Sequence, residues 1–402
     1  MKKFHFLVIS LFASVSLCSA QTINDYIQSI EMIDMGNDER SNCSELCYFD
    51  GAVYFTYFDE DDEVKDRHFL VKKTPTSSDT IAFSVFHLMY KKGFLNIIVD
   101  SNFVILQDQF FSYYYKRELN NLKYLLFKPH KEKSKNSKIF GQSYYIPYCN
   151  IQGGSLFEKT QTWVEVVDLE KKTHRIIEFP NPSGIECMYF QPRKLIEITK
   201  DNVYIMDVTD YKIRIYDYNG KLLDSIYKPF KNNPIIIPEV KVAKADEEYP
   251  FDLMHQKYAY SISEYREILN NAKVMCSINL LSDTTMMICY NEPTEGNKWY
   301  TYAFDLWKFD TKKKKWAVVK EGLKMESYEY EEREGNFDIK RIPLHNKFVA
   351  YYNNILVTQN KYNYDILNLK TYTTWKEFHG LNEDYLKKSE IPNTIFIYKL
   401  WF

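Results

Sequence analysis

The chain has little glycine, no long apolar segment after its first residues, and no excess of either charge. Only 12 of its 402 residues are glycine, so tight turns must rely on asparagine, aspartate and lysine. Past the N-terminus, no segment stays apolar over the ~20 residues that a membrane-spanning helix needs. The formal net charge of −2 excludes a global basic field that would gather nucleic acid or anionic lipid.

Motifs of common catalytic and metal sites are also absent. There is no HExxH or HxxxH pair, no GxSxG elbow and no phosphate loop, and no cysteines have zinc-finger spacing. The acidic run at residues 59–63 lacks the glycine and glutamate of a calcium loop, and we interpret it as a solvated loop. The lysines at 312–315, which precede Trp316, are interpreted as a soluble hairpin tip. The sequence therefore predicts no cofactor, no metal site and no nucleic-acid partner, and it leaves any catalytic residues unknown.

The first twenty residues have the pattern of a secretory signal peptide. Lys2 and Lys3 precede an apolar run, and small residues at 18–20 provide a cleavage site before Gln21. We therefore predict a signal peptide at 1–20 and an exported mature domain at 21–402, located in the periplasm or outside the cell. An uncleaved anchor and lipid attachment at Cys18 are the alternatives.

Aromatic residues make up 17% of the chain, and these residues favour β-structure. The clearest hairpins lie between Leu195 and Ile226, where LIEITKDNVYIMD turns at 200–202 and IRIYDYNGKLLDSI turns at Asn219-Gly220. Similar pairs of hairpins recur, with second turns near residues 76, 120, 171, 219, 312 and 371, at steps of about 50 residues. The one double step contains a predicted helical insertion at about 246–273, with a capping box from Ser261 to Glu264.

This pattern predicts an all-β chain folded as a six-bladed β-propeller, with four-stranded antiparallel blades and the helical insertion before blade five. The segment 394–402 (TIFIYKLWF) is expected to close the ring by completing a blade begun at the N-terminus. A pair of β-sandwiches is the alternative architecture.

The segment IRIYDYNGKLLDSI, which follows VYIMD, resembles the repeat of the exported six-bladed propellers of the NHL/TolB-like group, found among poorly characterised proteins of Bacteroidota. The resemblance is clear only in residues 203–226. It implies a propeller with no recognised catalytic set.

Six cysteines remain in the mature chain. If a hairpin turns at Ser282-Asp283, Cys276 faces Cys289, and directly opposed strand positions bring Cβ atoms near the separation that a disulfide requires. Cys43 and Cys47 are close enough in sequence to form a second bridge. We therefore name Cys276, Cys289, Cys43 and Cys47 as candidates for structural disulfides, with reduced cysteines as the alternative.

Two functions follow from this interpretation. The first is a binding or scaffolding module that holds a protein or a glycan at the channel mouth and blade loops. The second is a hydrolase or lyase that cleaves glycans or esters at the channel mouth. A propeller assembles its sites from distant loops, so the absence of a local motif does not decide between them.

Overall fold

The computed structural model describes sixteen segments of the chain. They are residues 26–34, 46–59, 67–83, 96–107, 112–116, 136–151, 160–180, 194–207, 210–230, 273–293, 300–324, 328–329, 341–342, 349–351, 354–360 and 394–402. These segments form β-strands and turns, and none of them contains an α-helix. Among the residues described, no helix has the length and apolar character that crossing a bilayer requires.

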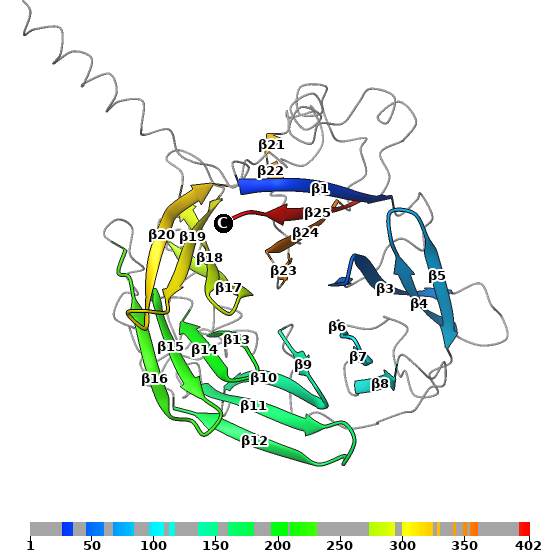
Figure 1. Cartoon of the computed structure of the whole chain (residues 1–402), viewed down its shortest axis with the longest axis horizontal. Coiled ribbons are helices and arrows are strands. Elements are labelled where there is room, and N and C mark those ends of the chain that lie inside the picture. The colour runs from blue at the N-terminus through cyan, green and yellow to red at the C-terminus, as the bar shows by residue number, and fades with distance from the viewer. Residues whose placement is uncertain are drawn as a thin grey trace, which may run out of the picture.

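Consecutive strands pair into antiparallel sheets that are arranged in a ring (Figure 1). The first sheet contains β2 (Leu46–Phe49), β3 (Ala52–Asp59), β4 (Arg67–Lys73) and β5 (Ser78–Phe83). The second contains β6 (Asn96–Val99), β7 (Phe103–Gln107) and β8 (Ser112–Lys116). The third contains β9 (Lys138–Phe140), β10 (Ser143–Ile151), β11 (Thr160–Asp168) and β12 (His174–Phe179).

The next two sheets follow the same pattern of neighbouring strands. The fourth contains β13 (Lys194–Ile198), β14 (Asn202–Asp207), β15 (Lys212–Asp217) and β16 (Leu222–Tyr227). The fifth contains β17 (Val274–Ser282), β18 (Thr285–Pro293), β19 (Tyr300–Asp310) and β20 (Lys315–Lys324). A separate two-stranded pair is formed by β21 (Tyr328–Glu329) and β22 (Arg341–Ile342).

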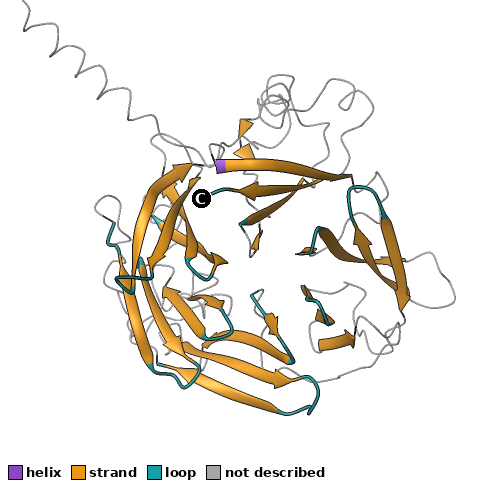
Figure 2. Ribbon diagram, in the orientation of Figure 1, coloured by secondary structure: helices purple, strands orange, loops and turns teal. Residues whose placement is uncertain are grey.

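The last sheet joins the two ends of the chain. Its order is β1 (Ile27–Asp34), β25 (Thr394–Leu400), β24 (Ile355–Asn360) and β23 (Val349–Tyr351). Ile33 of β1 lies opposite Ile395 of β25, and both are almost fully buried. The expectation that the C-terminal strand completes a blade begun at the N-terminus is confirmed, and the ring of sheets defines a β-propeller fold (Figure 2).

One detail of the predicted architecture needs correction, and another lies outside the described residues. The prediction of six four-stranded blades is wrong for the described residues, because five sheets have four strands and the β6–β8 sheet has three. The predicted helical insertion at 246–273 lies outside the described residues, except for Lys273, which is not helical. The expected turns near residues 120 and 371 also lie outside them.

Aspartate replaces glycine as the residue that organises several hairpin turns. Asp217 Oδ1 accepts hydrogen bonds from the backbone N–H groups of Asn219 and Lys221, both at 2.9 Å. Asp100, Asp168 and Asp310 bind the N–H groups of their own turns in the same way. An aspartate at the end of a strand therefore forms an Asx turn, which explains how a chain with few glycines makes so many hairpins.

The core is divided among the interfaces between neighbouring sheets. One buried cluster joins the β13–β16 sheet to the β17–β20 sheet and includes Tyr211, Ile213, Met286 and Trp307. Another joins the β9–β12 sheet to the β13–β16 sheet through residues such as Val164 and Ile205. Each sheet thus buries apolar side chains against its neighbours around the ring, as propeller blades do.

Candidate functional site

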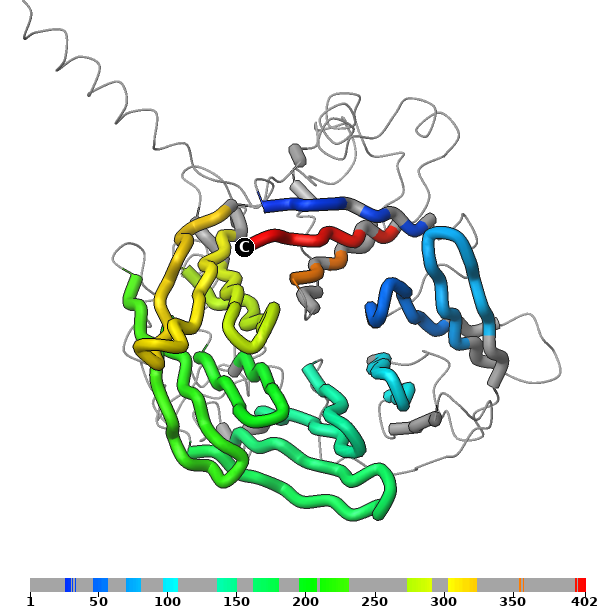
Figure 3. Tube along the Cα trace, in the orientation of Figure 1, coloured from blue at the N-terminus to red at the C-terminus, as the bar shows by residue number. Residues whose placement is uncertain are grey.

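In the sheets built from consecutive strands, the first strand lies toward the centre of the ring, whereas β1 lies at the outer edge of the closing sheet (Figure 3). Two of the inner strands, β9 and β13, carry an ion pair. Lys138 begins β9 and Glu197 lies in β13, so the pair joins the inner strands of two neighbouring sheets. Its Nζ and Oε1 atoms are in direct contact. The Glu197 side chain is 7% exposed, whereas that of Lys138 is 33% exposed.

Burial controls the electrostatics of Glu197. It raises the pKa of the carboxyl group above its usual value, and the Lys138 ammonium opposes this shift. The backbone N–H of Ile198 donates a further hydrogen bond to Oε1 at 3.1 Å. A buried carboxyl group with a perturbed pKa is a candidate functional group, although ion pairs that only stabilise the fold perturb pKa values too.

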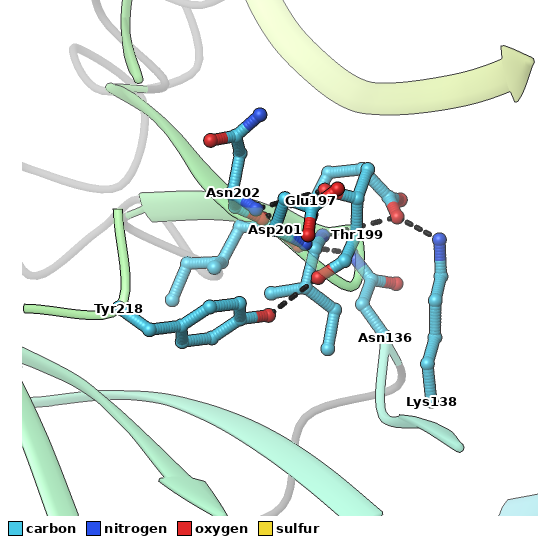
Figure 4. A network of polar contacts seen from close by, with 9 residues as sticks. Asn136, Lys138, Glu197, Thr199, Asp201, Asn202 and Tyr218 are labelled. Carbon is cyan, nitrogen blue, oxygen red and sulfur yellow. Dashed lines mark hydrogen bonds and ion pairs between the residues drawn. The ribbon is translucent and has the colours of Figure 1, made fainter. Parts of the chain in front are cut away.

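The surrounding turns hold this pair in place (Figure 4). Asn136 donates a hydrogen bond from Nδ2 to the carbonyl of Ile196 at 2.6 Å. The Tyr218 hydroxyl donates to the carbonyl of Thr199 at 2.6 Å, and burial raises the pKa of that hydroxyl. Turns that lie far apart in sequence therefore bind the middle of β13 and the residue that follows it, and the ion pair forms a polar centre at the inner edge of two sheets.

A second buried carboxylate lies between the β13–β16 and β17–β20 sheets. Asp305, which is 0% exposed, accepts a hydrogen bond from Lys228 Nζ at 2.5 Å and from the Gly322 N–H at 2.9 Å. The Tyr290 hydroxyl lies 3.4 Å from its Oδ1. The Lys228 ammonium is also 5.5 Å from the centre of the Tyr211 ring. Asp305 thus joins two sheets through charge and aromatic contacts together.

Aromatic side chains surround the Asp305 carboxylate. Trp307 Nε1 donates a hydrogen bond to the Tyr211 hydroxyl at 2.8 Å. The Phe230 ring lies 5.1 Å from that of Tyr290, and the Lys273 ammonium is 5.2 Å from the centre of the Phe230 ring. Burial and the nearby Asp305 charge raise the pKa of Tyr211 well above its usual value, so its hydroxyl stays protonated at physiological pH.

A third buried acid, Glu165 of β11, is 1% exposed. Its Oε2 accepts a hydrogen bond from the Tyr148 hydroxyl at 3.3 Å, and its Oε1 lies 3.4 Å from His174 Nδ1. Burial raises the pKa of Tyr148, and the Glu165 charge raises it further. Within the described ranges, no three His, Cys, Asp or Glu side chains come together in a group able to hold a metal ion.

The predicted cysteine sites are placed only in part. Cys43 lies outside the described residues, and Cys47 is a buried residue of β2 whose pKa is raised to about 12 by burial. Cys276 and Cys289 lie on the neighbouring strands β17 and β18. Their predicted direct opposition is wrong by one position, because a bulge after Met275 places Ser277 opposite Cys289. No disulfide joins cysteines of the described segments.

The structure also places the lysine run at 312–315 and Trp316, which the sequence had singled out. Lys312, Lys313 and Lys314 lie in the exposed turn between β19 and β20, as expected, and the exposed Lys315 begins β20. Trp316 is half-buried and packs on Phe309, with ring centres 5.5 Å apart, and on Tyr204, with ring centres 6.4 Å apart. Its ring is therefore part of the packing between sheets.

Sequence reasoning missed the buried acids. Each is a single charge inside an apolar strand: Glu197 in LIEI, Glu165 in WVEVV and Asp305 in FDLW. A single acid inside an apolar strand was the available signal of a buried ion pair or hydrogen bond. A strand buried on both faces accepts a charged side chain only when another group pairs with it. Lys138 and Lys228 are 59 and 77 residues away from the acids they pair with, so the sequence did not reveal the partners.

Comparison with known proteins adds little to this picture. No protein-family model matches the chain, and no similar curated protein is found. A solved member of the DUF4221 family from Bacteroides vulgatus has a TM-score of 0.45 and 7% identity, over 93% of this chain and 97% of that one. A protein of unknown function from Bacteroides caccae has a TM-score of 0.35 and 10% identity, over 72% of this chain and 78% of that one. The N-terminal domain of Nup159 has a TM-score of 0.38 and 9% identity, over 74% of this chain and 68% of that one.

Proposed function

We propose that the protein is an exported binding or scaffolding module whose ligand is another protein. The arrangement of its charges supports binding rather than chemistry. All five buried charged residues of the described segments have partners within the fold; they are Glu165, Glu197, Asp207, Arg214 and Asp305. Contacts of this kind stabilise the junctions between strands and sheets.

The observation that carries the proposal is the outer edge of the β13–β16 sheet. There β16 exposes Leu222, Leu223 and Tyr227 by 51%, 50% and 59%. The strand is also the last of its sheet, so one side of its backbone faces away from β15. Native proteins usually protect exposed edge strands by charge or bulges. The register of β16 does shift between Ile215 and Tyr216 of β15, but its leucines stay exposed. An extended segment of a partner can add to such an edge by backbone hydrogen bonds, while its apolar side chains cover the leucines.

A library of displayed random peptides, panned against the full-length protein, tests this proposal. We expect apolar, extended peptides to bind, and binding to fall at least tenfold when Leu222→Asp and Leu223→Asp are combined. The matched control is Val319→Asp, which alters an exposed residue of β20 that is 44% exposed. Equal losses in both variants, or binding only to soluble polysaccharides tested in parallel, would contradict a protein ligand at this edge.

A glycan- or ester-cleaving activity is the second candidate, and Glu197 favours it. The raised pKa of this buried carboxyl group is the property that a general acid requires, and Lys138 lies beside it. Chromogenic glycosides and esters test this function, with Glu197→Gln as the variant and Asp207→Asn as a control that alters another buried acid. Turnover that Glu197→Gln abolishes and Asp207→Asn preserves would establish the hydrolase and displace the binding module as the main function.

A further inference from the structure

Cys276 and Cys289 are placed together by an irregularity in the pairing of β17 with β18. The register shifts between Met275 and Ser277, so Cys276 is the extra residue of a β-bulge. In a bulge, two residues of one strand oppose a single residue of the other. Cys276 and Ser277 therefore share Cys289 as their opposite residue, and the two cysteine side chains are in hydrogen-bond contact.

The two thiols differ in their access to solvent. Cys289 is 1% exposed, and Cys276 is half-buried. Burial raises the pKa of the Cys289 thiol well above its usual value, and the adjacent Cys276 raises it further. A reagent from solution therefore reaches Cys276 first, and Cys289 reacts only with a group that Cys276 already carries.

We propose that Cys276 and Cys289 are a redox modification site, in which an external disulfide converts the two thiols into a cross-strand disulfide. The Cys276 thiolate attacks one sulfur of the external disulfide, and the other half leaves as a thiolate that takes up the proton lost by Cys276. Cys289 then attacks the Cys276 sulfur, loses its own proton and releases the second half as a thiol. One disulfide and two thiols are consumed, and one disulfide and two thiols are formed.

The other described cysteines have different surroundings. Cys47 is buried in a cluster between the β2–β5 and β6–β8 sheets, and Cys149 packs between the β9–β12 and β13–β16 sheets. Each belongs to a different sheet from the Cys276–Cys289 pair. The β17–β18 bulge is therefore the place, within the described segments, where two thiols meet.

Mass spectrometry of the full-length protein tests the proposal. The protein is incubated with oxidised glutathione, remaining thiols are alkylated, and the chain is cut with trypsin. The tryptic peptide 274–298 contains Cys276, Cys289 and no other cysteine. We expect this peptide to lose two hydrogens and take up no alkyl group, and we expect dithiothreitol to restore alkylation of both thiols.

Two variants sharpen the result. In Cys289→Ser, Cys276 should keep a bound glutathione, because the resolving thiol is missing, whereas Cys149→Ser should form the link as the natural chain does. The oxidised natural chain should also melt on the order of a few °C higher than its reduced form. The proposal fails if both cysteines of the natural peptide are still alkylated after oxidation. It also fails if Cys276 of the natural chain keeps a bound glutathione and no Cys276–Cys289 disulfide forms.

Discussion

At the scale of single residues, the fold depends on charged side chains with specific partners. The buried acids Glu197 and Asp305 pair with lysines from neighbouring sheets. The turn aspartates act locally, each binding N–H groups only two to four residues ahead. The local contacts were open to prediction because an aspartate at the end of a strand indicates a turn, whereas the pairs between sheets depend on how distant strands pack.

The turn aspartates predict a loss of stability in acid. Backbone N–H groups bind the Asp217 carboxylate and hold its pKa below the usual value. Its ionised form therefore contributes stability at neutral pH, and this contribution disappears as the pH falls below about 4 toward the lowered pKa. We expect Asp217→Asn to melt with a weaker dependence on pH between about pH 5 and pH 2 than the natural chain.

Melting temperatures measured across that range check this prediction, with Glu170→Gln in another exposed turn as the control. Glu197 has the opposite effect on stability, because its raised pKa lowers stability as the pH rises. Since the natural chain and both variants contain Glu197, its effect is the same in all three melting curves. An Asp217→Asn variant that loses stability in acid as steeply as the natural chain would show that the turn contributes nothing to acid sensitivity.

At the scale of elements, the sequence predicted the hairpins that have strong turn residues, but it did not predict the register in which β17 pairs with β18. The turns at 200–202, at Asn219-Gly220 and near residues 76, 171 and 312 lie between paired strands, as expected. The β17–β18 hairpin turns at 283–284, one residue later than the predicted Ser282-Asp283, and bulges shift its pairing further. A bulge has no residue signature in this segment, so the sequence could not reveal it. The turn predicted near residue 120 lies outside the described residues, so the β6–β8 sheet is described by three strands.

The turn between β15 and β16 provides a test at this scale. Gly220 has a φ of +77°, and a Cβ atom added there would lie 3.2 Å from the carbonyl oxygen of Glu178 in β12. Gly51 has a similar φ of +74° but open space around it. Gly220→Ala should therefore cost the ~1 kcal/mol of the unfavourable backbone conformation plus a further cost for displacing the neighbouring sheet.

Urea unfolding of Gly220→Ala and Gly51→Ala measures the two costs, since both variants share the backbone strain. We expect Gly220→Ala to be destabilised more than Gly51→Ala, by about 1 kcal/mol. Equal losses of unfolding free energy in the two variants would mean that the β15–β16 turn is not in close contact with β12.

At the scale of the whole molecule, the chain closes on itself through its first and last described strands. The aromatic residue Tyr26 packs on Trp401 and Phe402, with ring centres 5.6 and 5.4 Å away. Closure of the ring hides sheet edges that would otherwise face solvent. The sequence predicted this closure from the terminal strand at 394–402, in which apolar side chains alternate. In a propeller, such a strand completes the blade that the N-terminus begins. The outer edge of the ring at β16 is the place where we propose that the partner binds.

The central claim, that β1 pairs with β25 to close the ring, is tested by a disulfide engineered between Ser29→Cys and Lys399→Cys. These exposed positions lie directly opposite each other, within disulfide reach. The control joins Glu31→Cys to Lys399→Cys, a diagonal pair about 7–8 Å apart and beyond that reach. We expect peptide mapping of the monomer to show the 29–399 link in high yield and the 31–399 link in low yield. Equal yields from the two pairs, or 29–399 links found only between separate chains, would contradict the closed ring.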